Sequence, residues 1–480
     1  MMTQSNYIGG VWVPGSGDST FDNRNPADHA RVLHRFPDST SADADSAVRA
    51  ALAAQVGWSE RTAPQRADFL MRASRILEDR TEEIARGLSD EEGKTLPEAR
   101  GETSRAVSLL RYYAGACWLA EGEVIPSSTP GALLYTRRLP LGVCALITPW
   151  NFPIAIPVWK AAPALAFGNC VVLKPSEHAS GTALRLAQVF HDAGLPAGVF
   201  NVLFGTHTAG EALVAHAEVK GISFTGSAAT GKKVALAAVE RGARYQLEMG
   251  GKNGLLVMAD ADLSRAAALT LSGAFRSAGE KCTATSRCIV HEGIYDEFCA
   301  VLLRGVGELR TGPAEDEDCV MGPLISQEAL ERVEAFVGRA LHDGAELLCG
   351  GSRLTGDPFD RGWYFAPTIL SGVRPEMEIA QDEVFGPVLC LMRCTDDSAM
   401  TLLNGTKFGL SASIVTQSLK RAMEFAASAD VGMVKINGET AGVELQAPFG
   451  GVKGSSSFSR EQGSAAREFY TQLQTVSVEA

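Results

Sequence analysis

The sequence contains no apolar run of the ~20 residues that a membrane-spanning helix needs. Its longest apolar stretches, around 141–148 and 161–173, are interrupted by Gly, Pro or Asn. Residues 1–7 are polar and lack the basic start and the apolar segment of a secretory signal. We therefore expect a cytoplasmic protein that has no membrane partner.

The sequence also lacks the cysteine spacings that are typical of disulfide frameworks and of metal sites. The ten cysteines among 480 residues form no C-x-x-C pair and have no regular spacing, so we expect reduced thiols and no bound metal. An excess of positive charge is missing as well, because 44 basic residues are outnumbered by 56 acidic ones and the net charge is -12. Such a surface repels nucleic acid phosphates, and the composition favours a small-molecule partner.

The length and the hydrophobic pattern indicate a large globular protein. At 480 residues the chain exceeds what a single core usually supports, and its 45% hydrophobic content is that of an ordinary soluble protein. Three segments have apolar residues three and four positions apart and predict amphipathic helices: 42–56, 64–90 and 98–120.

Strand-like and helix-like segments then alternate, a pattern that predicts parallel sheets in an α/β protein. The first set of strand candidates is VCALIT, CVVLKP, VFNVLFG and GISFTGS, separated by predicted helices near 157–167, 180–193, 208–216 and 229–240. A second set predicts a second α/β domain and consists of GLLVMA, SRCIVHE, VLCLMRC and VKIN.

Two segments predict a projecting arm. The turn Pro130-Gly131 lies between short β-prone runs and predicts a hairpin. The last segment, TQLQTVSVE, has the pattern of a strand with no partner nearby in the sequence. We expect it to pair with the hairpin of another subunit.

A glycine-rich turn, FTGSAATGKK, follows a predicted strand and opens a predicted helix, where backbone N–H groups can hold a phosphate. It fits neither common nucleotide motif. Lys233 stands where a Walker A loop has Ser or Thr, and the spacing G-x-G-x-x-G is absent. By spacing alone, this segment is either a phosphate-holding turn or an ordinary glycine-rich turn.

Three segments carry groups suited to catalysis. FRSAGEKCTA places Cys282 beside Lys281, where a positive charge and an adjacent helix N-terminus would favour the thiolate. LEMGGKN places Glu248 on a tightly turning backbone as a candidate general base, and PWNFP presents Asn151 as an amide donor for an oxyanion. Taken alone, each of these residues is more simply explained by packing or by a position on the surface.

Two further segments offer polar groups for a ligand. KPSE follows the predicted strand CVVL, at the sheet edge where ligands bind, and its Lys174 and Glu177 are suited to hydrogen bonds with ribose hydroxyls. The alternative is a solvated pair at a strand end. EVFGP offers Glu383 and Phe385 on another rigid turn, either for binding or for packing.

Taken together in chain order, PWNFP, KPSE, FTGS, EMGGKN, GEKC, EVFGP and APFGGVKGS resemble the aldehyde dehydrogenase superfamily. The resemblance spans nearly the whole chain. It implies an NAD(P)-dependent, hydrolytic homodimer or homotetramer that has a Rossmann-type cofactor domain, a second α/β catalytic domain and a small β oligomerisation arm. The implied ranges are 1–120 and 141–250 for the dinucleotide-binding domain, 251–435 for the catalytic domain, 121–140 and 462–480 for the arm, and 436–461 for a segment returning near the active site.

The resemblance also implies a role for each matching residue. Cys282 would be the nucleophile that forms a thioester, and Glu248 the base that activates the hydrolytic water. Asn151 and the backbone N–H of Cys282 would stabilise the oxyanion. Lys160 and Glu461 match a pair that supports water handling near the thiol. The implied cofactor contacts are Trp150, Lys174, Ser176, Glu177, Gly205, Gly226, Ser227, Gly250, Glu383 and Phe385.

One position departs from the family pattern. Glu280 stands where the family usually has Gln. The segment GEKC would therefore place a negative charge near the nucleophile and oppose formation of the thiolate, with Lys281 as a compensating charge.

The expected substrate is an anionic semialdehyde, with 2-oxoglutarate semialdehyde first. Arg276, six residues before Cys282, matches an arginine that binds the distal carboxylate in semialdehyde-oxidising relatives, although a structural arginine is the alternative. AGVELQAPFGG resembles 2-oxoglutarate semialdehyde (2,5-dioxopentanoate) dehydrogenases more than betaine-aldehyde or retinal types. Succinic semialdehyde and aromatic aldehydes such as benzaldehyde or vanillin stay open, because the expected pocket residues are mostly apolar: Ile156, Trp159 and Leu445.

Cofactor preference and two rival functions stay open as well. Glu177 would bond the 2′-hydroxyl of NAD and crowd a 2′-phosphate, which favours NAD, while Lys174 leaves NADP possible. A catalytically silent binding or structural protein on the same fold is one rival. A CoA-acylating dehydrogenase is the other, but it would have little use for a hydrolytic base such as Glu248.

Overall fold

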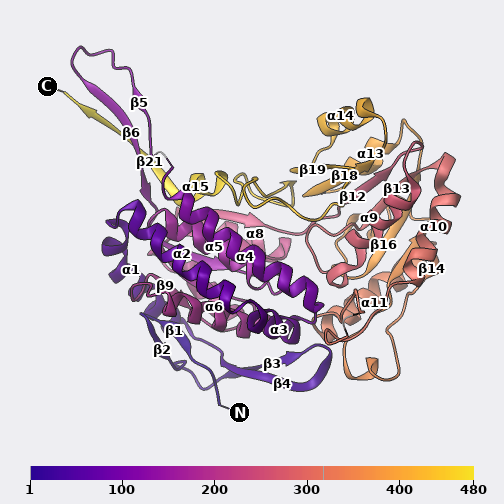
Figure 1. The fold of residues 1–480 in the computed structure, drawn as a ribbon, viewed down its shortest axis with the longest axis horizontal. Coiled ribbons are helices and arrows are strands. Elements are labelled where there is room, and N and C mark those ends of the chain that lie inside the picture. Colours follow the sequence, from indigo (N-terminus) through magenta and orange to yellow (C-terminus); the bar gives the residue numbers. More distant parts are fainter. Residues whose placement is uncertain (1, 120, 317, 480) are drawn as a thin grey trace.

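The computed structural model describes residues 2–119, 121–316 and 318–479. Two α/β bodies lie side by side, each built on a seven-stranded sheet, and a narrow arm projects from the first body (Figure 1). This arrangement confirms the expected α/β class, with a Rossmann-type sheet, a second α/β unit and a small β arm.

The first sheet is parallel through five strands and ends in an antiparallel edge. Its order is β11 (Arg244–Glu248), β10 (Val219–Thr225), β7 (Val143–Ile147), β8 (Cys170–Lys174), β9 (Phe200–Val202), β1 (Asn6–Ile8) and β2 (Val11–Val13). The central strands β7 and β8 are buried along almost their whole length, as expected for apolar strands covered on both faces.

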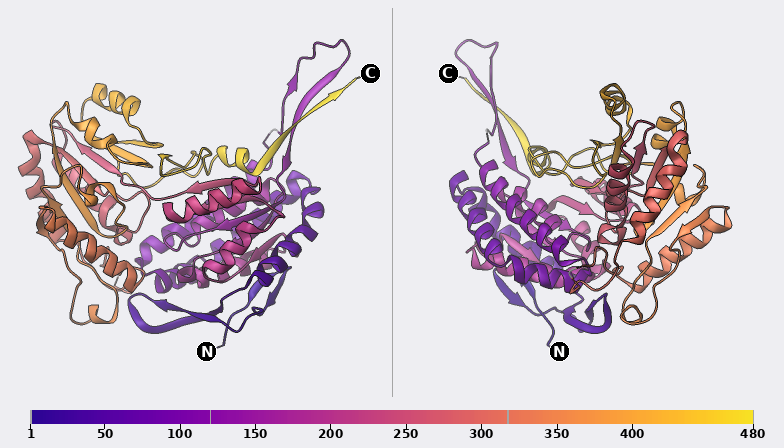
Figure 2. Two further views of the ribbon diagram at one scale, coloured as in Figure 1. Left: turned by 180° about the vertical axis from the view of Figure 1, so that it is seen from behind. Right: turned by 45° about the vertical axis from the view of Figure 1, so that its right-hand side comes forward.

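Helices flank this sheet on both sides (Figure 2). They are α1 (Ser41–Ser59), α2 (Ala63–Asp79), α3 (Thr81–Glu92), α4 (Leu96–Ala116), α5 (Ala155–Ala166), the 3₁₀ turn η1 (Glu177–Ala179), α6 (Ser180–Asp192), α7 (His207–Ala215) and α8 (Ala228–Glu240). Thr95 and Glu98 form a capping box at the start of α4, which satisfies backbone N–H groups that have no partner inside the helix.

Two helix predictions need correction. The single helix expected over 64–90 is two helices, because Arg80 between α2 and α3 leaves the helical conformation with φ -100 and ψ 12. The apolar spacing continues across this one residue, so periodicity alone does not detect the break. The helix expected over 98–120 ends at Ala116, and residue 120 lies outside the described residues, as do residues 1 and 480 of the expected domain ranges.

The second sheet is parallel except at one edge. Its order is β14 (Glu346–Cys349), β15 (Thr368–Ser371), β16 (Val388–Cys394), β13 (Arg287–His291), β12 (Gly254–Val257), β18 (Ser411–Val415) and β19 (Met433–Ile436), with β14 antiparallel to β15. The accompanying helices and 3₁₀ turns are α9 (Leu263–Phe275), η2 (Arg276–Gly279), η3 (Glu292–Ile294), α10 (Tyr295–Gly307), α11 (Gln327–His342), η4 (Phe359–Arg361), α12 (Glu378–Gln381), α13 (Ala399–Asn404) and α14 (Leu419–Ser428).

Shorter strands complete the chain. β3 (Thr20–Asn25) pairs with β4 (Asp28–Pro37), and β17 (Phe408–Gly409) pairs with β20 (Val452–Lys453). After β19 the chain returns from the second body to the first and enters α15 (Ala465–Tyr470) (Figure 1). In the described part of the chain, no helix combines the length and the apolar character needed to cross a membrane.

The arm is a three-stranded sheet of β21 (Thr471–Val478), β6 (Leu133–Pro140) and β5 (Val124–Ile125). β21 runs antiparallel to β6 of the same chain, from Thr471 opposite Pro140 to Val478 opposite Leu133. The C-terminal strand thus pairs with the hairpin, as expected, but the expectation that this pairing joins two subunits is wrong. The reason is that α15 brings the chain directly to the base of its own hairpin.

A buried carboxylate on α3 holds the start of α6, the helix that follows KPSE. Glu91 accepts hydrogen bonds from the backbone N–H of Gly181 at 2.5 Å and from the backbone N–H and hydroxyl of Thr182, both at 2.7 Å. The first N–H groups of a helix have no partner within it, so Glu91 caps α6 from a neighbouring helix.

Glu91→Ala should therefore lower the free energy of unfolding by about 1–3 kcal/mol, because buried N–H groups lose their acceptor. Glu83→Ala on the same helix is a matched control, since Glu83 is exposed, and its effect should stay within about 0.5 kcal/mol. Urea unfolding of both variants provides the measurement. Equal midpoints for the two variants would contradict the capping role.

Candidate active site

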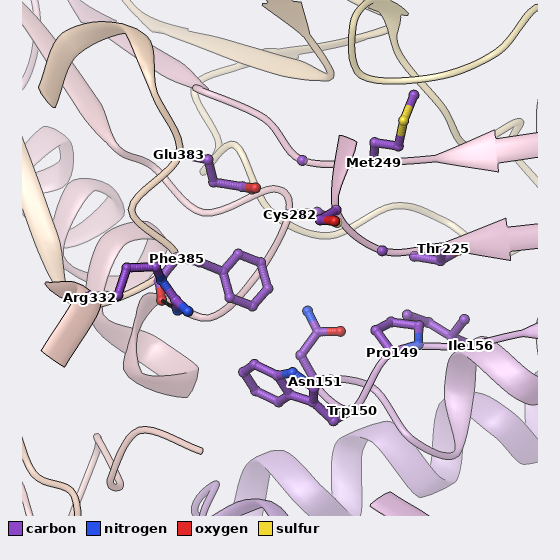
Figure 3. A pocket seen from close by; sticks show the side chains of 13 residues that line it. Pro149, Trp150, Asn151, Ile156, Thr225, Met249, Cys282, Arg332, Glu383 and Phe385 are labelled. Carbon is purple, nitrogen blue, oxygen red and sulfur yellow. Dashed lines mark hydrogen bonds between the residues drawn. The ribbon is translucent and has the colours of Figure 1, made fainter. Parts of the chain in front are cut away.

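A cavity of about 320 Å³ lies where the two bodies meet, and it forms at one edge of the first sheet. The carboxyl ends of three neighbouring parallel strands, β7, β10 and β11, supply one wall, which is where open α/β sheets bind ligands. The second body supplies the opposite wall (Figure 3). The lining residues are Pro149, Trp150, Asn151, Ile156, Thr225, Gly226, Ser227, Met249, Gly250, Cys282, Arg332, Glu383 and Phe385.

Cys282 is half-buried in this cavity and sits on a firmly held loop. The turn before it has three residues in the left-handed region, with φ 53 at Ser277, 50 at Ala278 and 69 at Gly279. Gly279 must lack a side chain because a Cβ there would overlap the backbone of Gly386. The backbone carbonyl of Cys282 accepts a 2.8 Å hydrogen bond from the Asn253 amide. The loop therefore presents the sulfur from a fixed backbone.

The surroundings of Cys282 favour the neutral thiol. Burial raises the pKa of this thiol to about 12, and the charges of Glu383 and Glu248 contribute to the rise. The expectation that Lys281 and a helix N-terminus favour the thiolate is wrong, because the segment after Cys282 leads into β13 and not into a helix. Burial also lowers the pKa of Lys281.

The surroundings of Glu280 oppose the negative charge that was expected beside Cys282. Its side chain is 1% exposed, and burial raises the pKa of its carboxyl well above the usual range, with a further rise caused by Glu92. These effects favour the protonated, neutral form, which resembles the glutamine that the family usually has at this position.

Asn151 lies at the end of β7 with its side chain directed into the cavity, toward the loop that carries Cys282 (Figure 3). Its amide nitrogen donates a 2.9 Å hydrogen bond to the backbone carbonyl of Glu280. Its amide oxygen is buried and has no hydrogen-bond partner among the described residues. The amide thus bridges the two bodies beside the loop that carries Cys282.

Glu248 ends β11, and a polar network lies behind it. One carboxylate oxygen accepts a 2.5 Å hydrogen bond from the Ser456 hydroxyl, and the other is buried without a partner in the described part of the chain. Burial raises the pKa of Glu248 well above its usual range, and the charge of Glu461 raises it further. Such a carboxyl takes up a proton more readily than an ordinary glutamate does.

Lys160 and Glu461 form a buried ion pair in this network. The Ser223 hydroxyl donates to Glu461 at 3.0 Å, and the indole N–H of Trp159 donates to the same carboxylate at 2.7 Å. The returning segment that carries Glu461 is thereby fixed to α5 and β10.

The remaining lining residues fit a dinucleotide. Gly226 and Ser227 open α8, where backbone N–H groups suit a phosphate, and the hydroxyl of Thr225 is buried without a partner in the described chain. A Cβ at Gly250 would overlap the Glu383 carboxylate, so a larger residue there would displace that side chain.

Aromatic rings and a carboxyl complete this part of the cavity. The rings of Trp150 and Phe385 are 5.6 Å apart and perpendicular, with one from each body (Figure 3). Glu383 accepts a 3.0 Å hydrogen bond from the Gly251 N–H, and burial raises its pKa to about 7.

The profile described as the aldehyde dehydrogenase family matches residues 12–476. The chain belongs to the aldehyde dehydrogenase family. It is therefore an NAD(P)-dependent enzyme that oxidises an aldehyde to a carboxylate, and the alternative of a catalytically silent protein is dropped.

Proteins similar in sequence or in structure cover almost the whole chain. An alpha-ketoglutaric semialdehyde dehydrogenase of Bacillus subtilis (strain 168) is 46% identical over 478 residues, which are 99% of this chain and 98% of that protein. A betaine aldehyde dehydrogenase point mutant from Staphylococcus aureus, solved in complex with NAD+, has a TM-score of 0.97 and 33% identity, covering 99% of this chain and 96% of that one. An NADP dependent enzyme of E. coli has a TM-score of 0.96 and 34% identity, covering 100% and 98%.

The aldehyde dehydrogenase cavity brings together most, but not all, of the residues expected from the sequence. Nine expected residues line it: Trp150, Asn151, Ile156, Gly226, Ser227, Gly250, Cys282, Glu383 and Phe385. Ten others are not among its lining residues: Glu248, Lys160, Glu461, Lys174, Ser176, Glu177, Gly205, Arg276, Trp159 and Leu445.

Several of these ten residues have other surroundings in the structure. Lys174 is buried with its ammonium 3.8 Å from the carboxylate of Glu177, and Ser176 caps the 3₁₀ turn that follows. Arg276 is exposed and lines a separate groove along α9 and α10. Leu445 is half-buried against the first core. Their proposed contacts therefore require a bound ligand that reaches beyond the cavity.

Sequence reasoning missed one charged residue of the aldehyde dehydrogenase cavity. Arg332 on α11 lines it and donates to the backbone carbonyls of Val384 at 3.3 Å and Phe385 at 3.4 Å. It lies within an ordinary amphipathic helix, and no local motif marks it.

Glu383→Gln should lower the pKa of Cys282, because it removes a negative charge that opposes the thiolate. At about pH 9 we expect alkylation of Cys282 by iodoacetamide to accelerate several-fold, less than the tenfold that one full pKa unit gives. Mass spectrometry of the Cys282 peptide distinguishes this site from the other cysteines. Asp382→Asn is the control, since Asp382 pairs with Lys407 and is not among the main charges acting on the thiol. An unchanged rate in Glu383→Gln would contradict this electrostatic account.

Proposed function

We propose that this enzyme oxidises an anionic semialdehyde, with 2-oxoglutarate semialdehyde first, and that it uses NAD in preference to NADP. The observation that carries the proposal is the cavity in which Cys282 and Asn151 meet, with Glu248 at the adjacent strand end. The name of the Bacillus subtilis relative supports the substrate.

In the proposed mechanism, the Cys282 thiol first releases its proton to solvent, and the thiolate then attacks the aldehyde carbon. The amide of Asn151 and the backbone N–H of Cys282 stabilise the resulting oxyanion. The oxidised nicotinamide, when bound, supplies the acceptor for the hydride. Cys282 then holds the acyl group as a thioester, and Glu248 removes a proton from the water that hydrolyses it. Lys160 and Glu461 hold the network behind this base.

We propose dinucleotide contacts on both sides of the cleft. Gly226 and Ser227 would hold the pyrophosphate, with Gly205 and Gly250 leaving room for the cofactor. Glu383, Phe385 and Trp150 would contact the nicotinamide end. Lys174, Ser176 and Glu177 would lie at the adenosine ribose, where the carboxylate of Glu177 accepts from a 2′-hydroxyl and repels a 2′-phosphate. This repulsion is the reason for preferring NAD.

Two cations close to Cys282 in the sequence support an anionic substrate: Lys281, which precedes it, and Arg276, which lines the separate groove along α9 and α10. The side chain of Lys281 makes no ion pair with any described residue, although it is only 9% exposed. Burial lowers its pKa, the charges of Glu439 and Glu98 oppose this change, and the charge of Arg276 adds to it. A substrate carboxylate near Lys281 would further favour the charged lysine. Ile156, Trp159 and Leu445 would line the apolar part of the substrate path.

We also propose that residues 1–120 and 141–250 bind the dinucleotide, that 251–435 form the catalytic domain, and that 436–461 return near the active site. The arm, 121–140 with 462–480, would join subunits into a homodimer or homotetramer. Its exposed apolar side chains support this role: Val124, Ile125, Leu133, Leu473 and Val478.

A panel of aldehydes with NAD and with NADP tests the substrate and the cofactor together. We expect the highest kcat/KM for 2-oxoglutarate semialdehyde with NAD, a lower value for succinic semialdehyde, and the lowest values for benzaldehyde and vanillin. Cys282→Ala should show no oxidation. A preference for the aromatic aldehydes would overturn the anionic substrate, and a strong preference for NADP would overturn the argument from Glu177.

Arg276→Gln sharpens this test. Loss of a charge-assisted hydrogen bond worth about 1.5–3 kcal/mol should raise KM for the semialdehydes by roughly 10- to 100-fold and leave benzaldehyde unaffected. Arg304→Gln, in the same groove, is the matched control.

Glu248→Gln should stall hydrolysis of the thioester. Rapid mixing should show a burst of reduced nicotinamide approaching one equivalent per site, followed by turnover about 100-fold slower than in the unaltered enzyme, since a general base contributes about 10²- to 10⁴-fold. In the unaltered enzyme, hydrolysis should slow as the pH falls, at a higher pH than for an ordinary glutamate, because the pKa of Glu248 is raised. Normal turnover in the variant would exclude the assigned role.

A further inference from the structure

A buried lysine lies directly behind the loop that carries Asn151. Lys94 is 3% exposed, and its ammonium group donates to the Glu102 carboxylate at 2.7 Å and to the backbone carbonyl of Asn151 at 2.8 Å. It also lies 3.6 Å from the carboxylate of Glu92 and 4.5 Å from the ring centre of Phe152. The positive charge therefore contacts two consecutive residues of the PWNFP loop.

The second oxygen of Glu102 holds the far end of the same loop. It accepts hydrogen bonds from the backbone N–H of Ile154 at 3.0 Å and of Ala155 at 3.1 Å, where α5 begins. Lys94 and Glu102 are bonded to each other, so the loop is held at both ends by one ion pair. Because Glu102 belongs to α4 and Lys94 precedes that helix by two residues, the start of α4 sets the position of Asn151.

The same helix also reaches the nucleophile loop. Glu98, one turn before Glu102, accepts hydrogen bonds from the backbone N–H of Ser277 at 2.9 Å and from its hydroxyl at 3.1 Å. Ser277 begins the left-handed turn that leads to Cys282. One helical turn of α4 is therefore bonded to both loops that meet in the cavity.

Stability alone does not account for the buried cluster of Lys94, Glu92 and Glu102. Burial by itself lowers the pKa of Lys94, but the carboxylates of Glu102 and Glu92 outweigh it and raise the pKa, so the lysine is charged. A buried ion pair adds little net stability, because the loss of hydration offsets the attraction, and apolar residues of similar volume often serve as well. Its hydrogen bonds do, however, fix a backbone in one place.

We propose that Lys94 and Glu102 are positioning residues. They hold the Asn151 amide where it can donate a hydrogen bond to the oxyanion that forms beside Cys282. This inference rests on the proposed oxyanion role of Asn151. A displacement of about 1 Å in a catalytic group can cost about 10²-fold in rate. Loss of the ion pair should therefore lower kcat far more than it changes the KM for aldehyde.

A double-mutant cycle of Lys94→Met and Asn151→Ala tests the proposal. Asn151→Ala should lower kcat by about 10²- to 10³-fold, as loss of one oxyanion donor does. Lys94→Met should lower kcat by about 10- to 100-fold in the unaltered enzyme. In the Asn151→Ala background, the same change should lower kcat by less than about threefold, because residues that act through one another are not additive.

Glu102→Gln is a second variant in case Lys94→Met does not fold. Its amide oxygen still accepts from Ile154 and Ala155, but its NH₂ group cannot accept from Lys94, so the same non-additive loss is expected. Glu82→Gln is the control. Glu82 binds Arg100 on the exposed side of α4 at 2.8 and 2.9 Å, and its removal should leave kcat unchanged.

Three results would overturn the inference. Multiplicative losses in the double variant would show that Lys94 acts independently of Asn151. An unchanged kcat per titrated active site, with only a lower Tm, would show a purely structural role. A normal kcat in Asn151→Ala would instead remove the oxyanion role itself and, with it, this inference, so the two failures are distinguishable.

Discussion

Everything at the catalytic centre depends on three parallel strands ending at the same edge of one sheet. β7, β10 and β11 deliver PWNFP, the start of α8 and Glu248 to neighbouring positions, because parallel register aligns their carboxyl ends. The second body then supplies only what the edge lacks, a sulfur and a second wall. Separation of the two halves would leave no complete site in either.

Burial decides which groups are charged around this edge. Burial raises the pKa of Cys282, Glu248 and Glu383, and the charges of Glu383 and Glu248 add to the rise at Cys282. Burial therefore disfavours the negative form of all three groups. Glu280 shows the same effect, since its burial raises its pKa and so favours a neutral acid where the family usually has an amide.

The alternating strands could be predicted from the sequence, because short apolar runs and glycine-rich turns are local signals. Of the expected site residues, nine line the cavity and ten do not. Sequence reasoning failed where the cause is three-dimensional. The break at Arg80 interrupts no hydrophobic pattern. The rise in the pKa of Cys282 comes mainly from burial, with a further contribution from Glu383, about a hundred positions away in the chain. Lys94 and Glu102 escaped notice for the same reason: in the sequence they are ordinary charges at a helix start, and only folding buries them behind Asn151.

The final strand of the arm has a consequence for biosynthesis. β6 leaves the ribosome long before β21, yet β21 is its longest partner, and the segment just before β21 brings Ser456 to Glu248 and Glu461 to Lys160. Neither the complete arm nor the polar network around Glu248 can form until residues 456–478 have been synthesised. A chain that stops before β21 would expose the edge of β6 that β21 covers and would lack the contacts of Ser456 and Glu461.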